Sequence, residues 1–201
     1  MAFKTWSLLY FIIHRTAMTI ACFVSAMSVC ASSGKPPSSF VDEGACPFEC
    51  CTYREWTVEA DTLLLVKPED PAKIIGKARK GTKVRGLTGI VIVTKPGQIE
   101  VLRPHTGESG RTYKPGDTVW VYTERGEGFF RVWYNGEIYD EEASFMYQDR
   151  GGQERCVDEG TCWGKRRNFP LSVWWVKVKI SDGTVGWSKT PENFGNIDAC
   201  G

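Results

Sequence analysis

No charge of one sign predominates in this chain. Lysine and arginine total 25, and aspartate and glutamate total 24, so the formal net charge is only +1. A balanced chain has no net field that would attract nucleic acid or an anionic membrane by charge alone. We therefore expect no nucleic acid and no other polyanion as a partner.

Histidine is scarce as well, because the chain contains only His14 and His105. A Cys–His hydrolase needs an imidazole beside its thiol, and a zinc amidase needs several histidine or carboxylate ligands at short spacing. His105 lies in the polar, Gly-rich stretch RPHTGESGRTYKPG, which is more typical of a mobile turn than of a rigid catalytic wall. We therefore expect a protein that is not an enzyme and that holds no metal and no cofactor.

The acidic residues offer the remaining route to catalysis. Paired carboxylates cleave glycosides, and carboxylate oxygens bind calcium. None of the spacings is typical of a calcium loop, so we interpret these residues as a solvated acidic loop that lies opposite the basic residues 165–167. The acidic residues concerned are Asp140, Glu141, Glu142, Asp149, Glu154, Asp158 and Glu159.

Hydrophobic runs long enough to span a bilayer are also missing. The apolar stretch 17–29 is shorter than about 18 residues, and His14-Arg15 interrupts the longer run before it. Lys4 and Arg15 precede this stretch, and Val29-Cys30-Ala31 follows it with small residues suited to cleavage after Ala31. We predict that residues 1–31 are a signal peptide, that residues 32–44 are a flexible linker, and that the mature chain is secreted or periplasmic without an integral membrane span. A retained membrane anchor and a lipoprotein are the alternatives.

The cysteine content agrees with export. Six cysteines follow residue 31, and an even number in an exported chain favours a disulfide framework. Cys156 and Cys162 enclose five residues that include Gly160, so a local bridge between them is sterically easy, and we predict it. The pairing of Cys46, Cys50, Cys51 and Cys200 stays open. A zinc site is the alternative, although the Cys-x2-Cys spacing usual in such sites does not occur among these six cysteines.

Short strand patterns separated by Gly- and Pro-containing turns dominate the rest of the chain. The 21 glycines and 10 prolines, with abundant aromatic residues, are typical of an all-β fold with an aromatic core. No stretch has the period of a long amphipathic helix, and the best candidate is a single turn at 139–147. Alternation and turn signals predict strands at 56–58, 62–66, 73–78, 83–88, 90–94, 118–123, 129–134, 173–180 and 185–188.

The strand predicted at 173–180 shows the clearest alternation. A period of two places Trp174, Val176 and Val178 on one face, with Ile180 beyond them. Trp175, Lys177 and Lys179 then share the opposite face. The pattern predicts a half-buried antiparallel strand.

Two segments resemble bacterial SH3-like (SH3b-type) domains. TLLLVKPEDPAKIIGKARKGTKVRGLTG is similar to the opening half of such domains, and WWVKVKISDGTVGWSKTPENF is similar to their closing half. The interval between the halves, residues 89–173, is far longer than in a compact domain of this type. Either one barrel encloses an insertion that carries its own strands, or two small barrels pack together. We favour two barrels, at 45–112 and 113–201, the second interrupted by an inserted loop at 137–171.

The resemblance implies an exported, non-catalytic binding protein of the bacterial cell envelope. SH3-like barrels bind extended peptides on aromatic-lined grooves, so the partner would be a peptide, a cell-wall component or an envelope protein. The alternatives are an accessory or degenerate peptidoglycan hydrolase and a structural assembly protein without a small ligand. The candidate ligand-binding aromatic residues are Tyr113, Trp120, Tyr134, Trp163 and Trp175, each of which could instead pack within or between the barrels.

Overall fold

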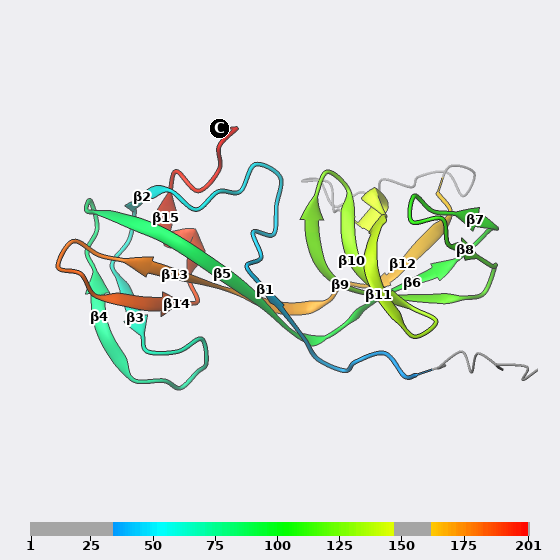
Figure 1. Cartoon of the computed structure of the whole chain (residues 1–201), viewed down its shortest axis with the longest axis horizontal. Coiled ribbons are helices and arrows are strands. Elements are labelled where there is room, and N and C mark those ends of the chain that lie inside the picture. The colour runs from blue at the N-terminus through cyan, green and yellow to red at the C-terminus, as the bar shows by residue number, and fades with distance from the viewer. Residues whose placement is uncertain (1–33, 147–161, 201) are drawn as a thin grey trace, which may run out of the picture. The chain divides into compact units, whose positions relative to one another are not determined.

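The computed structural model describes residues 34–146 and 162–200. Within these ranges the chain is built from strands, and the helical residues are two short 3-10 turns, η1 (Ser144–Met146) and η2 (Pro191–Asn193) (Figure 1). The predicted all-β fold class is therefore confirmed. The single helical turn predicted within 139–147 corresponds to η1. No helix in the described ranges is both long and apolar enough to cross a membrane.

The first sheet has eight strands in the order β15-β2-β5-β13-β14-β3-β4, with β1 paired to β5 beside this path. Its longest strand, β5, has 13 residues and pairs with β13 from Lys95↔Leu171 to Arg85↔Lys179. The strands of this sheet are β1 (Phe40–Glu43), β2 (Glu55–Val58), β3 (Thr62–Leu65), β4 (Ile74–Ala78), β5 (Lys83–Lys95), β13 (Leu171–Lys179), β14 (Val185–Ser188) and β15 (Phe194–Gly195).

The second sheet has five strands in the order β11-β10-β9-β6-β12. All of its pairs are antiparallel, and a separate two-stranded hairpin, β7–β8, lies between β6 and β9 in the sequence. These strands are β6 (Gly97–Val101), β7 (His105–Thr106), β8 (Thr112–Tyr113), β9 (Thr118–Gly126), β10 (Phe129–Tyr134), β11 (Glu137–Glu142) and β12 (Gly164–Asn168).

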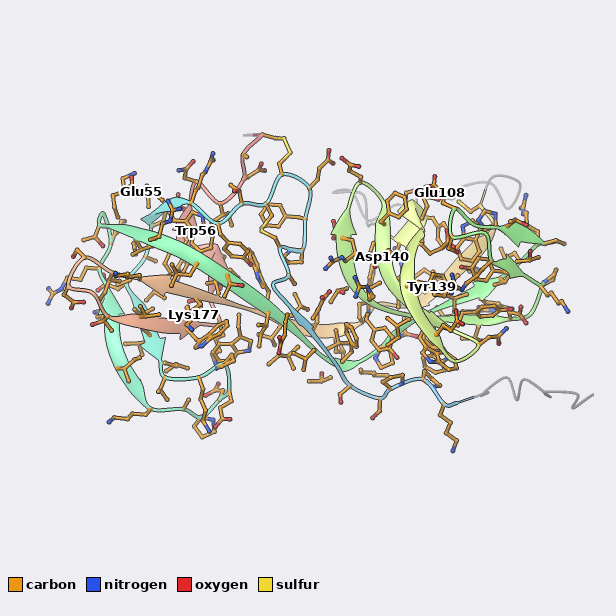
Figure 2. The ribbon with its side chains drawn as sticks, in the orientation of Figure 1. Glu55, Trp56, Glu108, Tyr139, Asp140 and Lys177 are labelled. Carbon is orange, nitrogen blue, oxygen red and sulfur yellow. A yellow bond between two sulfur atoms is a disulfide. The ribbon has the colours of Figure 1, made fainter. Side chains whose placement is uncertain are left out.

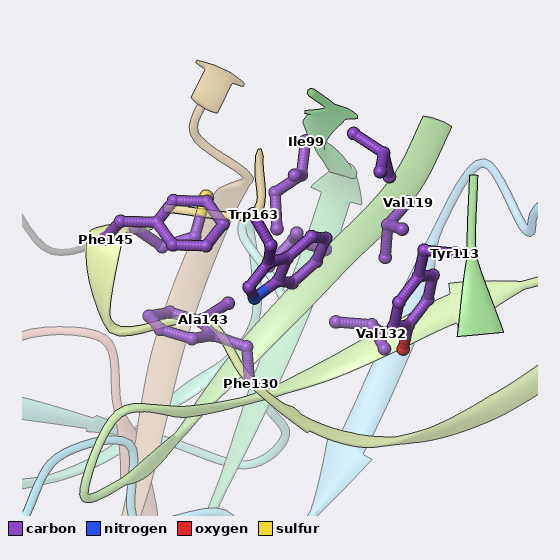
Figure 3. Close-up of a cluster of buried hydrophobic side chains, with 11 residues drawn as sticks. Ile99, Tyr113, Val119, Phe130, Val132, Ala143, Phe145 and Trp163 are labelled. Atoms are coloured by element: carbon purple, nitrogen blue, oxygen red, sulfur yellow. The ribbon is translucent and has the colours of Figure 1, made fainter. Parts of the chain in front are cut away.

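Each sheet has its own hydrophobic core. In the first sheet Trp56 packs against Phe194 and the buried face of β13, where Val176 and Val178 lie as the alternation predicts. In the second sheet Trp163 lies among aromatic and branched side chains of β6, β9, β10 and η1 (Figure 3). A third cluster contains Val91 and Val93 of β5 together with Tyr122 of β9. The two sheets therefore also share a packed contact.

The division of the chain between the two sheets differs from the expected boundary at residue 112. The second sheet uses only residues 97–168, whereas the first is formed by residues 40–95 together with residues 171–195. The physical reason is that β5 pairs along most of its length with β13, so the first sheet needs a strand from the far end of the chain. The strands of the second sheet are therefore inserted between two strands of the first, the arrangement that the sequence left as the alternative.

Three further expectations from the sequence need correction. Residues 40–43, expected within a flexible linker, form β1 because this strand pairs with β5 and buries Asp42. Residues 137–142 and 164–168, expected in an inserted loop, form strands β11 and β12 of the second sheet. The strands predicted at 83–88 and 90–94 are one continuous strand through Gly89.

Two disulfides are described, Cys46–Cys51 and Cys50–Cys200. The first closes the short loop 46–51, and the second joins this loop to the C-terminal residues. Cys162 is also disulfide-bonded. The predicted Cys156–Cys162 bridge stays a prediction, since Cys156 lies outside the described residues, as does the predicted signal peptide.

Candidate functional site

An aromatic pocket of about 310 Å³ lies where the two sheets meet. Trp174 and Ser172 of β13 contribute one side, and Tyr122 and Phe130 of the second sheet contribute the other. Phe169 and Pro170 immediately precede β13 in the sequence and also line this pocket. The Phe169 side chain is 37% exposed. The lining therefore combines aromatic faces with the polar side chains of Ser172, Thr123 and Glu124. We call this site the aromatic pocket.

The aromatic rings of the pocket are held in place by contacts behind them. The Tyr122 ring lies 4.8 Å from that of Phe40, and its hydroxyl donates to the Pro37 carbonyl oxygen at 2.9 Å. Burial raises the pKa of Tyr122 to about 12, so its hydroxyl stays protonated at neutral pH. The Trp174 ring meets Phe48 edge-on, with centroids 5.8 Å apart. The pocket is therefore preformed.

A second hollow of about 470 Å³ adjoins the other side of loop 46–51. Its walls are Phe48 and Glu49 of this loop together with Arg125, Phe129 and Asp140 of the second sheet. Pro47 of the same loop lines the aromatic pocket. The disulfide-closed loop therefore borders both cavities, which follow one another along β9 from Glu124 to Arg125.

An ion-pair chain fixes β1 and the second sheet to each other near this hollow. The buried Asp42 carboxylate accepts hydrogen bonds from the Thr123 hydroxyl and from Arg125 Nη1, the latter at 3.1 Å. Arg131 binds Asp140 through two bonds, Nε–Oδ1 at 2.6 Å and Nη2–Oδ2 at 3.2 Å. Arg125 Nε lies 3.8 Å from Asp140 Oδ2 and so connects the two carboxylates. Charged groups are paired here, which suits a structural role.

Glu141 forms the second candidate site, because its carboxylate is fully buried. Oε2 accepts hydrogen bonds from the Tyr113 hydroxyl at 2.7 Å and the Ser109 hydroxyl at 2.8 Å, while the backbone amides of Glu108 and Glu142 donate to Oε1 at 3.1 Å. A Cβ at Gly107 would lie 2.0 Å from Oε2, so only glycine fits there. The carboxylate therefore fastens the turn of the β7–β8 hairpin, near the labelled Glu108 and Tyr139 (Figure 2).

The aromatic residues around Glu141 form a stack. The His105 ring lies parallel to that of Trp163 with centroids 4.8 Å apart, and Tyr113 stacks on Trp163 at 5.0 Å. Burial, followed by the hydrogen bond to Glu141, raises the pKa of Tyr113, so this hydroxyl is not available as an anionic nucleophile. His105 pairs with Tyr113 across the hairpin and is not the mobile-turn residue that the sequence predicted. The stack packs the hairpin onto the core.

The five aromatic residues proposed from the sequence do not form one site. Tyr113, Trp163 and Trp175 are buried, which favours the packing alternative for them. Trp120 and Tyr134 are half-buried, and the Tyr134 hydroxyl donates to Asp117. None of the five lines the aromatic pocket.

Sequence reasoning missed the residues that do line the pocket. Trp174 was assigned to the apolar face of its strand, and Tyr122 and Phe130, which are buried, fell within predicted strands without a signal that they border a cavity. Because the pocket joins segments far apart in the chain, alternation within a single strand gave no indication of it.

The acidic residues 140–142 do not form the solvated loop that the sequence predicted. They lie in β11, where Asp140 pairs with Arg131, Glu141 is buried and Glu142 Oε1 accepts from the Ser144 amide at 2.8 Å. The remaining acidic residues of that expectation, 149–159, lie outside the described residues. Cys50, Asp198 and Cys200 lie close enough to hold a metal ion, but their two sulfur atoms are joined in a disulfide. Asp198 is therefore the one residue of this group whose ligand atom is not part of a disulfide.

No protein-family model, no curated protein and no solved structure gives a significant match to this chain.

Proposed function

We propose that this chain is an exported, non-catalytic binding protein of the bacterial cell envelope, and that it holds an extended peptide at the aromatic pocket. The observation that carries the proposal is the preformed cavity of about 310 Å³, lined by Tyr122, Phe130, Phe169 and Trp174. Aromatic rings with a few polar neighbours are the usual lining of peptide-binding grooves. The resemblance of 62–89 and 174–194 to SH3-like domains supports the same class of ligand.

The strand beside the pocket favours an extended ligand. β14 pairs with β13 only from Val176 onward, so in the described part of the chain no strand lies along that edge of residues 171–175. Ser172 and Trp174 of this same stretch line the pocket. A peptide strand could therefore bond to the open backbone edge while one of its side chains enters the pocket.

The contacts of the titratable groups support a role without catalysis. His105 is stacked on Trp163, Glu141 is engaged by four donors, and Asp140 is paired with arginine. The hydroxyls of Ser109 and Tyr113 donate to Glu141, but the carboxylate that accepts them is fully buried, which favours a structural role over activation of a nucleophile.

A peptide-display screen with a matched pair of variants tests this function. Peptides of random sequence are selected on the purified protein, and the affinity of the best ones is measured by calorimetry. Ser172→Tyr should fill the pocket and weaken binding at least tenfold. Val173→Tyr, one residue away on the opposite face of β13, should bind as the unaltered protein does.

Two results would contradict the proposal. Equal affinities of Ser172→Tyr and Val173→Tyr would show that the peptide binds elsewhere. Release of soluble fragments from purified peptidoglycan, with loss of that turnover in His105→Ala, would identify a hydrolase instead.

A further inference from the structure

One face of the first sheet carries several exposed side chains, and its composition can be derived from the strand register. Directly opposed residues of an antiparallel pair project to the same face. Ile74 opposes Leu65, Leu65 opposes Trp187, and Trp187 opposes Lys177, so one row crosses β4, β3, β14 and β13. A second row holds Val185, Lys179, Arg85 and, on β2, the acidic Glu55. We call this the outer face; Lys177 is labelled in Figure 2.

The outer face is unusually apolar for a surface. Ile74 is 55% exposed and Leu63, which shares its side of β3 with Leu65, is 51% exposed. Val185 is also exposed, and Trp187 is half-buried. The opposite face of the same strands buries Leu64, Val176 and Val178 completely, so the exposed residues do not belong to the core. Contiguous exposed apolar side chains typically mark a binding surface.

Cationic side chains are interleaved with these apolar groups. Lys177 Nζ lies 5.5 Å from the centre of the Trp187 ring, and Lys179 and Arg85 make no ion pair with the described residues. Lys77, opposite Leu63, has its ammonium paired with Asp61. Residues 54–95 and 171–195, which contain most of this sheet, carry twelve lysines and arginines against seven aspartates and glutamates. These residues therefore carry a net positive charge, although the chain as a whole is almost neutral.

We infer that the outer face docks on an anionic lipid surface. Lysine and arginine are attracted to anionic headgroups, while their alkyl stems can lie along apolar neighbours. A tryptophan within such a patch suits the boundary between headgroups and acyl chains. A soluble polyanion would satisfy the charges but would leave Leu63 and Ile74 exposed. The docking site is separate from the aromatic pocket and does not depend on the peptide-binding function.

Vesicle sedimentation tests this docking. The full chain is purified after export, and its N-terminal residue is determined so that all variants share one N terminus. Vesicles of phosphatidylcholine with about one third phosphatidylglycerol should bind the protein, and binding should weaken with added salt. The double variant Lys177→Gln/Lys179→Gln should lose roughly 25-fold in affinity, or about fivefold for each cation removed. Ile74→Ser should weaken binding as well.

Matched variants away from the outer face provide the controls. Lys114→Gln/Lys165→Gln removes the same charge, and Ile138→Ser replaces an isoleucine that is 40% exposed on β11; both should bind vesicles as the unaltered protein does. Circular dichroism melts establish that each variant is folded. Unchanged binding by Lys177→Gln/Lys179→Gln, or equal binding to vesicles without phosphatidylglycerol, overturns the inference. Loss of self-association in Ile74→Ser without vesicle binding by any variant would instead identify the outer face as a contact between copies.

Discussion

At the scale of single residues, Glu141 joins the β7–β8 hairpin to the second sheet. Its carboxylate accepts four hydrogen bonds inside the second sheet, and two of the donors belong to the β7–β8 turn. A buried carboxylate is tolerated when hydrogen-bond donors surround it. If the carboxylate is removed, those buried donors are left without an acceptor, which destabilises the fold. Glu141 therefore controls whether the hairpin remains packed.

Glu141→Ala should lower the free energy of unfolding by about 3–5 kcal/mol, because it leaves Tyr113, Ser109 and two amides without an acceptor. Urea unfolding measures this loss. Glu137→Ala, which removes only an exposed ion pair with Arg111, should change the value by less than about 1 kcal/mol. Equal stabilities for the two variants would mean that the carboxylate does not hold the hairpin.

At the scale of elements, β5 depends on a residue that usually interrupts strands. Gly89 lies at its middle, and a Cβ there would meet the Tyr53 hydroxyl at 2.2 Å, Trp174 Nε1 at 2.5 Å and the Trp175 carbonyl oxygen at 2.9 Å. The missing side chain lets Tyr53 and Trp174 approach the strand, and continuous pairing with β13 keeps the strand extended across the glycine.

Gly89→Ala should therefore destabilise the fold by about 3 kcal/mol, since the added methyl group enters space that is already filled. Thermal unfolding gives the measurement. In a Tyr53→Phe background the nearest atom is absent, and the same substitution should cost less. If the cost is the same in both backgrounds, the Tyr53 hydroxyl is not what excludes a side chain at residue 89.

Strands with strong alternation could be predicted from the sequence, and those with weak signals could not. Residues 173–180 and 185–188 were predicted almost to the residue, because β-branched and aromatic side chains alternate there. β12, with three consecutive basic residues, and β1, with only four residues, carry too little alternation. β6 begins at Gly97, directly after Pro96, and the pair Pro-Gly is typical of a turn. The aromatic pocket was not predicted for a different reason, because it joins segments that lie far apart in the sequence.

At the scale of the whole molecule, the two described disulfides constrain very different lengths of chain. Cys46 and Cys51 are five residues apart, whereas Cys50 and Cys200 are 150 apart. In the chain-entropy account, a bridge removes more freedom from the unfolded state when it closes a longer loop. The bridge between the distant residues should therefore contribute more to global stability.

Cys50→Ser/Cys200→Ser should lower the free energy of unfolding by about 5 kcal/mol, and Cys46→Ser/Cys51→Ser by about 2 kcal/mol. Urea unfolding of both double variants, with the other bridges verified by peptide mapping, compares them directly. A larger loss from opening the short loop would show that native packing of residues 46–51, rather than loop length, determines the contribution.

During synthesis, β5 is made well before its partner strand β13. Leu171 follows its partner Lys95 by 76 residues, so a ribosome adding about 5–20 residues per second delivers the partner roughly 4–15 seconds later. During that interval the apolar half of β5, with Val91 and Val93, has emerged without its main neighbour. All strands of the second sheet except β12 are complete by Glu142 and can pair in the meantime. The nascent chain therefore carries an unpaired apolar strand edge that a holding chaperone would recognise until the last strands are made.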